Sequence, residues 1–409
     1  MLRSFGLIGL MILALGCSRE SPADAPAQAG TPVAGQPATS AGGRSTLGAH
    51  FRVLSQQDRR ELDPPPPGGA VIAEILSRGP AQQARLAPGD VVVAVNGAPV
   101  RVLCDLYSGL TGHPPGTEVK LSVQRRNATF EAAVTLAAAA DLYAPSCQAG
   151  EAAGCLLLGW EKTPAEALPL YTRACDLGLA DGCALEGNAY LNGTGAAQDE
   201  QRAAVLFERA CLQGSAPACV SEAYQLVTGR GVLRDVDRAL DLYTRSCDGG
   251  DASGCYNVGV MLDMARGTER DPARAIRAYE QSCDGGYPLA CTNLGYLAQH
   301  GQDMPQDEAR AADLYRRACE PNGCNDPDPR GCANLGILYR RTIGVTADKT
   351  RAADLFRKGC DGGQADACFY LGEMLDAGEG IAKDPSRAAE LYEQACKGGH
   401  QPGCEMAGQ

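Results

Sequence analysis

Positions four residues apart carry a repeated set of small, aromatic and cysteine residues through the last two-thirds of the chain. An aromatic residue stands four places before the first cysteine of seven successive cysteine pairs, and an alanine stands four places before the aromatic residue. A spacing of four places all three side chains on one helix face, which must be buried. The aromatic residues are Tyr171, Phe207, Tyr243, Tyr279, Tyr315, Phe356 and Tyr392, and the alanines are Ala167, Ala203, Ala239, Ala275, Ala311, Ala352 and Ala388.

A glycine recurs four residues after the second cysteine of nearly every pair, as at Gly259 and Gly295, with Ala223 as the exception. This position lies one turn into the following helix. Glycine is costly inside a helix, so its recurrence predicts that two helices approach closely there. Asp271-Pro272 and Asp384-Pro385 have the order of a helix cap followed by a first-turn proline. Each repeat is therefore predicted to be helix, loop, helix.

The cysteine pairs are predicted to be disulfides at the corners between helices. Their first members return every 36 residues from Cys175 to Cys319, and such a period is typical of a stacked-repeat solenoid. Paired cysteines at this density indicate a compartment outside the cytosol. The expected bridges are Cys147–Cys155, Cys175–Cys183, Cys211–Cys219, Cys247–Cys255, Cys283–Cys291, Cys319–Cys332, Cys360–Cys368 and Cys396–Cys404.

Two further cysteines are harder to place. Spacing alone would pair Cys324 with Cys332, but the helix register favours Cys319, because it keeps Tyr315 and Ala311 in phase. Cys324 would then be an exposed thiol or an intermolecular link. Cys104 lies among apolar residues and is interpreted as a small buried side chain.

Residues 50–137 show a different pattern of short apolar runs separated by turn residues. The predicted elements are a strand at 71–76, a short helix from Pro80, a strand at 91–95 before an Asn-Gly turn, a helix at 102–110, and strands at 117–125 and 128–136. The string GGAVIAEILSRGPAQQARLAPGDVVVAVNGAPV closely resembles the PDZ domains of bacterial periplasmic proteases. The resemblance implies a small β-barrel with two helices, in which a peptide end is added as a strand.

By that resemblance, the peptide groove lies between the strand at 70–76 and the helix at 102–110. The expected peptide-binding residues are Gly68, Gly69 and Ala70 as backbone donors and Val71, Ile72, Leu103, Leu106 and Leu110 as walls. Pro64 to Pro67 remove donors from the preceding loop, and Arg85 stands where the family usually has glycine. Two alternatives stay open: the domain binds no peptide and only packs against the solenoid, or its groove holds the tail Glu405–Gln409.

Residues 142–409 resemble the SEL-one-like repeat, a relative of the tetratricopeptide repeat, most clearly at Asn293-Leu294-Gly295-Tyr296. One bridge per repeat makes the segment similar to the bacterial cysteine-rich Hcp subfamily. The fold class expected is therefore a small PDZ barrel followed by an all-α solenoid of about seven disulfide-stapled repeats, whose concave surface binds protein.

The N-terminal residues resemble a bacterial lipoprotein signal. A basic Arg3 precedes a short apolar run that ends in Leu15-Gly16-Cys17. The expectation is a signal peptide over residues 1–16, lipidation of Cys17 and a disordered tether over residues 17–49 rich in Ala, Pro and Gly. By the same resemblance, Ser18 after the cysteine, where Asp would be the alternative, implies transfer to the outer membrane in Gram-negative bacteria. An ordinary signal peptide is the alternative.

The chain has 49 Asp and Glu against 37 Lys and Arg, which argues against nucleic acid as a partner. No Gly-x-Ser-x-Gly, His-Glu-x-x-His, phosphate loop or Ser-x-x-Lys is present, and no cofactor or metal is expected. We therefore expect a lipid-anchored scaffold of the cell envelope, not an enzyme, with envelope proteins or C-terminal peptides as partners. The alternatives are a penicillin-binding or β-lactam-hydrolysing envelope enzyme, as reported for Hcp-like relatives, and a purely structural spacer.

Overall fold

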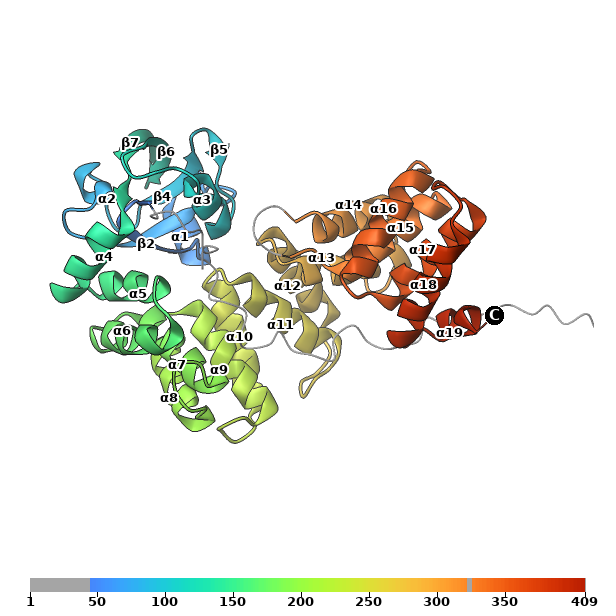
Figure 1. Cartoon of the computed structure of the whole chain (residues 1–409). Helices are drawn as coiled ribbons and strands as arrows, with labels where there is room; N and C mark the ends of the chain where they lie inside the picture. The colour runs from blue at the N-terminus through green and yellow to red at the C-terminus, as the bar shows by residue number, and fades with distance from the viewer. Residues whose placement is uncertain (1–44, 322–325, 409) are drawn as a thin grey trace, which may run out of the picture.

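A computed structural model describes residues 45–321 and 326–408, apart from the side chain of Cys104. It shows a sheet domain (residues 45–138) seated at one end of a helical solenoid (residues 139–408), as Figure 1 shows. The C-terminal helix lies at the opposite end of the solenoid from the sheet domain, so the tail before residue 409 does not reach the sheet domain. None of the described helices combines the length and apolar character needed to cross a bilayer.

The sheet domain follows the predicted order of elements closely from residue 70 onward. Its elements are β1 (Ser45–Thr46), β2 (Ala49–Val53), α1 (Gln56–Glu61), β3 (Ala70–Ile75), α2 (Pro80–Gln83), β4 (Val91–Val95), β5 (Ala98–Pro99), α3 (Leu103–Leu110), β6 (Glu118–Arg125), β7 (Ala128–Thr135) and β8 (Ala137–Ala138). The main sheet has the strand order β2-β3-β4-β6-β7, with β5 paired to β4. Among the described residues this ladder stays open between β2 and β7, so the closed barrel that we expected is not confirmed.

The sheet domain begins earlier than the sequence suggested. β1 pairs with β8, Ser45 with Ala138 and Thr46 with Ala137, so residues 45–49 belong to the fold and not to the tether. The cause is an alternation of apolar residues, which buries Leu47, Ala49 and Phe51 in the core of the sheet domain. The expected boundary at residue 50 therefore moves to residue 45.

The described part of the solenoid contains eight helix pairs, whereas the sequence predicted about seven repeats. The helices are α4 (Ala139–Gln148), α5 (Ala152–Trp160), α6 (Pro164–Asp176), α7 (Ala180–Asn192), α8 (Glu200–Leu212), α9 (Ala216–Thr228), α10 (Val236–Asp248), α11 (Ala252–Asp263), α12 (Pro272–Asp284), α13 (Pro288–His300), α14 (Glu308–Cys319), α15 (Pro329–Arg341), α16 (Lys349–Asp361), α17 (Ala365–Ala377), α18 (Pro385–Lys397) and α19 (Gln401–Ala407). Asp271 and Asp384 cap α12 and α18 through their carboxylates, as predicted.

A disulfide joins the two helices of every described pair at their short corner. All eight expected bridges are formed, with Cα–Cα distances of 4.4–4.8 Å. Cys319 pairs with Cys332, which confirms the choice made from helix register over spacing. Cys17, Cys324 and the side chain of Cys104 lie outside the described residues.

The recurring glycines stand where two helices meet, as predicted. A β-carbon placed at Gly187 would lie 2.8 Å from the ring of Phe207, and one at Gly259 would lie 2.5 Å from the ring of Tyr279. Both rings are fully buried. The same contact recurs at Gly159, Gly295, Gly336 and Gly372, each against the aromatic residue of the following helix. Glycine therefore makes room for the aromatic ring that anchors each repeat.

Candidate peptide-binding strand and its contact with the solenoid

The strand that we predicted as the wall of a peptide groove lies inside the sheet. β3 pairs with β2 along its length, and its first residues also pair with β4, Ala70 with Val92 and Val71 with Val91. A strand that is paired on both sides offers no free backbone groups to an added peptide. The predicted roles of Ala70, Val71 and Ile72 are therefore wrong, and all three are buried.

Gly68 and Gly69 serve the packing of the domain. A β-carbon at Gly68 would lie 2.4 Å from the carbonyl oxygen of Arg101, and one at Gly69 would lie 2.4 Å from Val91. The glycine pair allows two segments of backbone to come close together, which is a structural reason for glycine. The structure therefore does not place these two residues at a ligand site.

The residues of α3 that we predicted to line the peptide groove belong mainly to the core of the domain. Leu103 and Leu106 of α3 are buried in the same cluster as Phe51 and Val95, and Leu110 packs against that cluster from its edge. These residues hold α3 on the sheet. Tyr107 also lies on α3 and is partly buried against the same cluster.

β2 is the edge strand next to β3, and so it is the strand to which a peptide could be added. It pairs with β3 on one side, and no strand of the described chain pairs with its other side. Ala49 and Phe51 point into the core. The intervening residues, His50 and Arg52, therefore point to the opposite face of the sheet.

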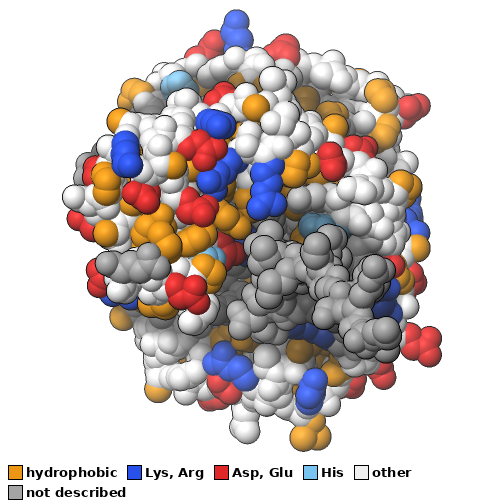
Figure 2. Space-filling view, turned by 90° about the vertical axis from the view of Figure 1, so that its right-hand side faces the viewer, with side chains coloured by type: hydrophobic (Ala, Val, Ile, Leu, Met, Phe, Trp, Pro, Cys, Tyr) orange, Lys and Arg blue, Asp and Glu red, His pale blue; other side chains and the backbone are white. Residues whose placement is uncertain are grey.

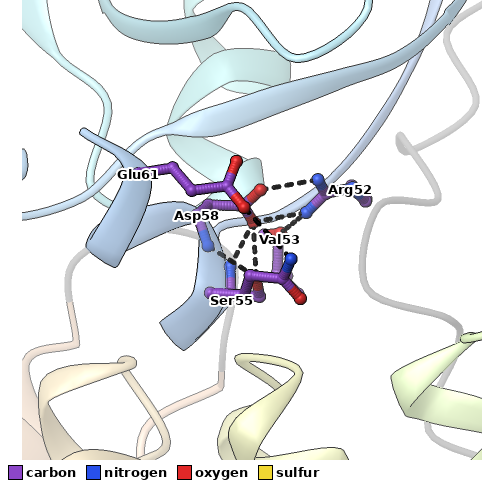
Figure 3. Close-up of polar contacts among 6 residues, drawn as sticks. Arg52, Val53, Ser55, Asp58 and Glu61 are labelled. Atoms are coloured by element: carbon purple, nitrogen blue, oxygen red, sulfur yellow. Dashed lines mark hydrogen bonds and ion pairs between the residues drawn. The ribbon is translucent and has the colours of Figure 1, made fainter. Parts of the chain in front are cut away.

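The end of β2 is fixed by a compact polar cluster, which Figure 3 shows in close-up. The guanidinium of Arg52 donates to both carboxylate oxygens of Asp58, at 2.5 and 2.7 Å. The backbone N–H of Ser55 donates to Asp58 at 2.8 Å, and the N–H of Asp58 donates to the Ser55 hydroxyl at 3.1 Å. Burial raises the pKa of Asp58, but the bonds from Arg52 and Ser55 outweigh it and hold the pKa below its usual value. The turn from β2 into α1 is thus rigid.

The outward face of β2 rests on the solenoid. The side chain of His50 is 4% exposed, and its Nε2 lies 3.2 Å from Oδ2 of Asp181 on α7. The hydroxyl of Ser215, just before α9, donates to the other oxygen of Asp181 at 2.8 Å. Asp181 therefore links an edge strand of the sheet domain to two successive helix corners.

Neighbouring corners of the solenoid add further contacts with the sheet domain. The backbone N–H of Ser77 donates to the carboxylate of Glu151, between α4 and α5, at 3.2 Å. A β-carbon at Gly250, between α10 and α11, would lie 2.5 Å from the carbonyl oxygen of Leu54. We call Glu151, Asp181, Ser215 and Gly250 the corner row, since they come from four successive disulfide corners. The sheet domain contacts Glu151, Asp181 and Gly250 directly. Ser215 does not contact the sheet domain in this way, but it supports the contact at Asp181 through its hydrogen bond to that residue.

The charge of Asp181 is stabilised by its partners. Burial raises its pKa, but the bonds from His50 and Ser215 outweigh burial, so the pKa lies below its usual value. A lowered pKa in the folded state adds stability above the unfolded pKa, and this stability is lost as the pH falls through the folded pKa. The contribution of Asp181 should therefore be complete from pH 5 to 7 and be lost below about pH 4.

We expect Asp181→Asn to lower the free energy of unfolding by about 1–2 kcal/mol at pH 7, and by less at pH 3. The single tryptophan, Trp160, packs in the cluster of α4 and α5 near the sheet domain, so its fluorescence in urea reports the transition. Asp366→Asn is a matched control, because Asp366 occupies the same position in the seventh bridge and is 55% exposed, 3.5 Å from His400. An equal loss at both pH values would contradict this assignment.

The rest of the solenoid surface carries both signs of charge, and many of its ion pairs join neighbouring repeats. Arg238 binds Glu208 at 2.7 Å and Arg310 binds Glu280 at 2.7 Å, each across one repeat. Arg245 donates to the carbonyl of Cys211 at 2.7 Å. Figure 2 shows acidic, basic and apolar side chains interspersed on the C-terminal end of the molecule.

One pattern in the sequence indicates β2, and our prediction did not use it. Leu47, Ala49, Phe51 and Val53 alternate with Gly48, His50 and Arg52, which is the pattern of a half-buried strand. The segment directly follows a stretch rich in Ala, Pro and Gly. Our prediction begins the domain at residue 50 and assigns no strand before residue 70. His50 and Asp181 have no local signal, because they meet only through the docking of two domains.

Comparison with known families matches both parts of the chain. The PDZ domain model matches residues 45–136. The Sel1 repeat model matches six segments, 181–215, 223–251, 252–287, 288–320, 329–364 and 365–400, which together make up about half of the chain. These are the SEL-one-like repeats that the sequence predicted.

Curated relatives match only through the PDZ part. A probable periplasmic serine endoprotease DegP-like from Ectopseudomonas mendocina (strain ymp) is 34% identical over 70 residues, which are 17% of this chain and 15% of the relative. The periplasmic pH-dependent serine endoprotease DegQ of Escherichia coli (strain K12) is 34% identical over 68 residues, again 15% of its length. The chain thus spans about 15% of the length of these relatives.

Solved structures match through the solenoid. A protective antigen present in uropathogenic Escherichia coli strains, which displays an SLR fold, superposes with a TM-score of 0.56 at 27% identity, over 65% of this chain and 57% of the antigen. A Sel1 repeat protein from Oxalobacter formigenes superposes with a TM-score of 0.52 at 20% identity, over 60% of this chain and 96% of that protein. The likeness to the Oxalobacter protein concerns the fold alone.

Proposed function

We propose that this chain, which belongs to the Sel1 repeat family and carries a PDZ domain of the DegP-like type, is an interaction scaffold of the bacterial cell envelope. The observation that carries the proposal is the corner row, where a rigid solenoid already holds a folded domain through specific polar contacts. A surface that docks one protein domain by the ends of its helices is suited to docking others along the uncovered repeats.

The eight disulfide bridges support both the proposed role as a binding scaffold and the proposed location in the cell envelope. A solenoid that is cross-linked at every described corner keeps its shape when a partner binds, so little entropy is lost on ordering it. Disulfides at this density persist only in an oxidising compartment, and the PDZ relatives are named as periplasmic proteins. We propose that Cys17 carries a lipid that anchors the chain in the envelope, facing the periplasm or the exterior, and that the outer membrane is its site.

The match to endoproteases covers the PDZ part alone, and the repeats supply the remaining length. We therefore propose that the chain binds envelope proteins and has no hydrolytic activity of its own. The concave surface of the solenoid is the proposed main binding face, and the edge strand β2 is the proposed site for an extended peptide.

We propose that the exposed aromatic residue Tyr296 is part of this binding face. Its ring is 42% exposed on α13 and stacks on His300 at 4.1 Å between centroids, and exposed tyrosines are frequent hot spots of interfaces. We expect Tyr296→Ala to reduce the recovery of cross-linked envelope partners about tenfold, measured by cross-linking in intact cells and mass spectrometry.

The control for this experiment is Val205→Ser, which changes a more exposed apolar residue, 66% exposed, on α8. It should leave the partners unchanged. If the full chain captures no protein above the background of an unrelated lipoprotein, the scaffold proposal is wrong. If capture persists in Tyr296→Ala, the binding face lies elsewhere on the solenoid and the proposed face is wrong.

A further inference from the structure

The free edge of β2 is covered although no strand pairs with it. Gly48, just before β2, and His50, within β2, are both buried, whereas an edge strand that receives peptides has to be accessible. Figure 1 shows α4 and α5 directly below the sheet domain, between the sheet and the following repeats. The cover therefore comes from the chain's own first repeats.

The residue just before β2, Gly48, is covered by α4. The Cδ2 atom of Leu142 lies 2.7 Å from the position of a β-carbon at Gly48, and 3.3 Å from the same position at Gly79. Leu142 packs there with Leu76 and Tyr143. A peptide added along β2 toward Gly48 would meet this apolar contact. The lack of a side chain at Gly48 is what lets α4 approach so closely.

The middle of β2 is covered by α7. Asp181 binds His50 of β2 at 3.2 Å, and it is close enough to Tyr107 of α3 to act on it electrostatically. Burial raises the pKa of Tyr107, and the charges of Tyr143 and Asp181 raise it further. One carboxylate from the solenoid thus contacts β2 and acts electrostatically on Tyr107 of α3.

We propose that the solenoid holds the peptide edge of this PDZ domain closed, and that an extended peptide segment can pair with β2 only after the contact at Asp181 is released. The inference rests on the proposed function in one respect, namely that β2 is the peptide-accepting strand. It adds that the occupant of the site in the resting protein is the chain's own α4 and α7.

The two parts of this cover differ in how they can move. α4 begins directly after β8, and β8 is paired with β1, so Leu142 moves together with the sheet domain. α7 is separated from the sheet domain by α4, α5 and α6 and touches it through polar contacts. A small rotation of the sheet domain against the repeats can break these contacts without unfolding either part. A partner that shifts α7 and the repeats that follow it would therefore uncover the middle of β2, while α4 keeps its contact at Gly48.

Hydrogen–deuterium exchange of the full chain at pH 7 tests this closure without any ligand. In Asp181→Ala the amides of β2 and α3 should exchange about tenfold faster than in the unchanged protein. The amides of β6 and β7, which lie away from the contact in the strand order, should not change. Asp366→Ala, at the equivalent position of the seventh bridge, should leave the sheet domain unchanged.

Asp181→Asn keeps the shape of the side chain and provides a milder variant, in which the same amides should accelerate to a smaller degree. The inference is overturned if the β2 amides exchange equally in the unchanged protein and both Asp181 variants. It is also overturned if the acceleration spreads equally over β4, β6 and β7, since that would report general loosening. Because no partner is added in this experiment, neither result bears on the scaffold proposal. That proposal is tested separately by the cross-linking experiment.

Discussion

Reduction of the eight disulfides is expected to unfold the solenoid while the core strands of the sheet domain stay folded. Each bridge with a sequence separation of 8 closes a short loop, which contributes about 2–3 kcal/mol in the chain-entropy model. Eight bridges give at most about 20 kcal/mol, more than the net stability of about 5–15 kcal/mol of a typical domain. The described residues of the sheet domain contain no bridge.

The measurement is a thermal melt with and without a phosphine reductant, followed by circular dichroism at 222 nm and by amide exchange in β4 and β6. We expect the helical signal to be lost at 37 °C in the reduced protein, while the strand amides remain protected. The double variant Cys211→Ala/Cys219→Ala removes one bridge and should lower the free energy of unfolding by about 2–3 kcal/mol. A reduced protein that melts at the same temperature would show that helix packing alone holds the solenoid.

The repeats could be predicted from sequence because each position is constrained locally and many times over. The spacing of Ala311, Tyr315 and Cys319 on one helix face was enough to choose Cys319 as the partner of Cys332. The alternative partner, Cys324, has the regular spacing of the other pairs. A single repeat would not have carried this information. Eight copies of the same environment did, since every helix pair meets the next in the same way.

The candidate site could not be predicted to the same depth, and the reason lies in tertiary pairing. Whether β3 is an edge strand or an inner strand depends on which segments pair with it, and our prediction assigned no strand to residues 50–53, where most of the edge strand β2 lies. Gly68 and Gly69 are as suited to close packing as to ligand binding, and their sequence does not distinguish the two. Arg85, where the family has glycine, adopts φ of 59°, so the backbone keeps the turn that glycine would take.

The contact between the domains was beyond sequence analysis for a different reason. His50 and Asp181 are 131 positions apart, and each is an ordinary residue in its own element. They meet because β8 is followed directly by α4. This short connection positions the sheet domain against the first corners of the solenoid. The structure shows the packing of the PDZ domain against the solenoid, which is one part of our alternative that the domain packs there and binds no peptide. This packing uses β2, the strand that is also the proposed peptide site.

Gly259→Val is expected to lower the free energy of unfolding by about 2–3 kcal/mol, because the branched side chain would enter the space of the buried ring of Tyr279. The exception at Ala223 sets the limit of what this contact tolerates. There a methyl group faces the following helix, and the ring of Tyr243 is still buried. Gly259→Ala should therefore cost far less, since better helix propensity offsets the tighter contact.

A double-mutant cycle separates the ring contact from any general effect of valine in a helix. In a Tyr279→Leu background the smaller side chain leaves room at position 259, so Gly259→Val should cost at least about 1 kcal/mol less than in the unchanged protein. Urea unfolding followed by circular dichroism gives all four free energies. Equal costs in the two backgrounds would mean that the glycine is needed for the backbone of α11 and not for the ring, and that the repeated glycine has another cause.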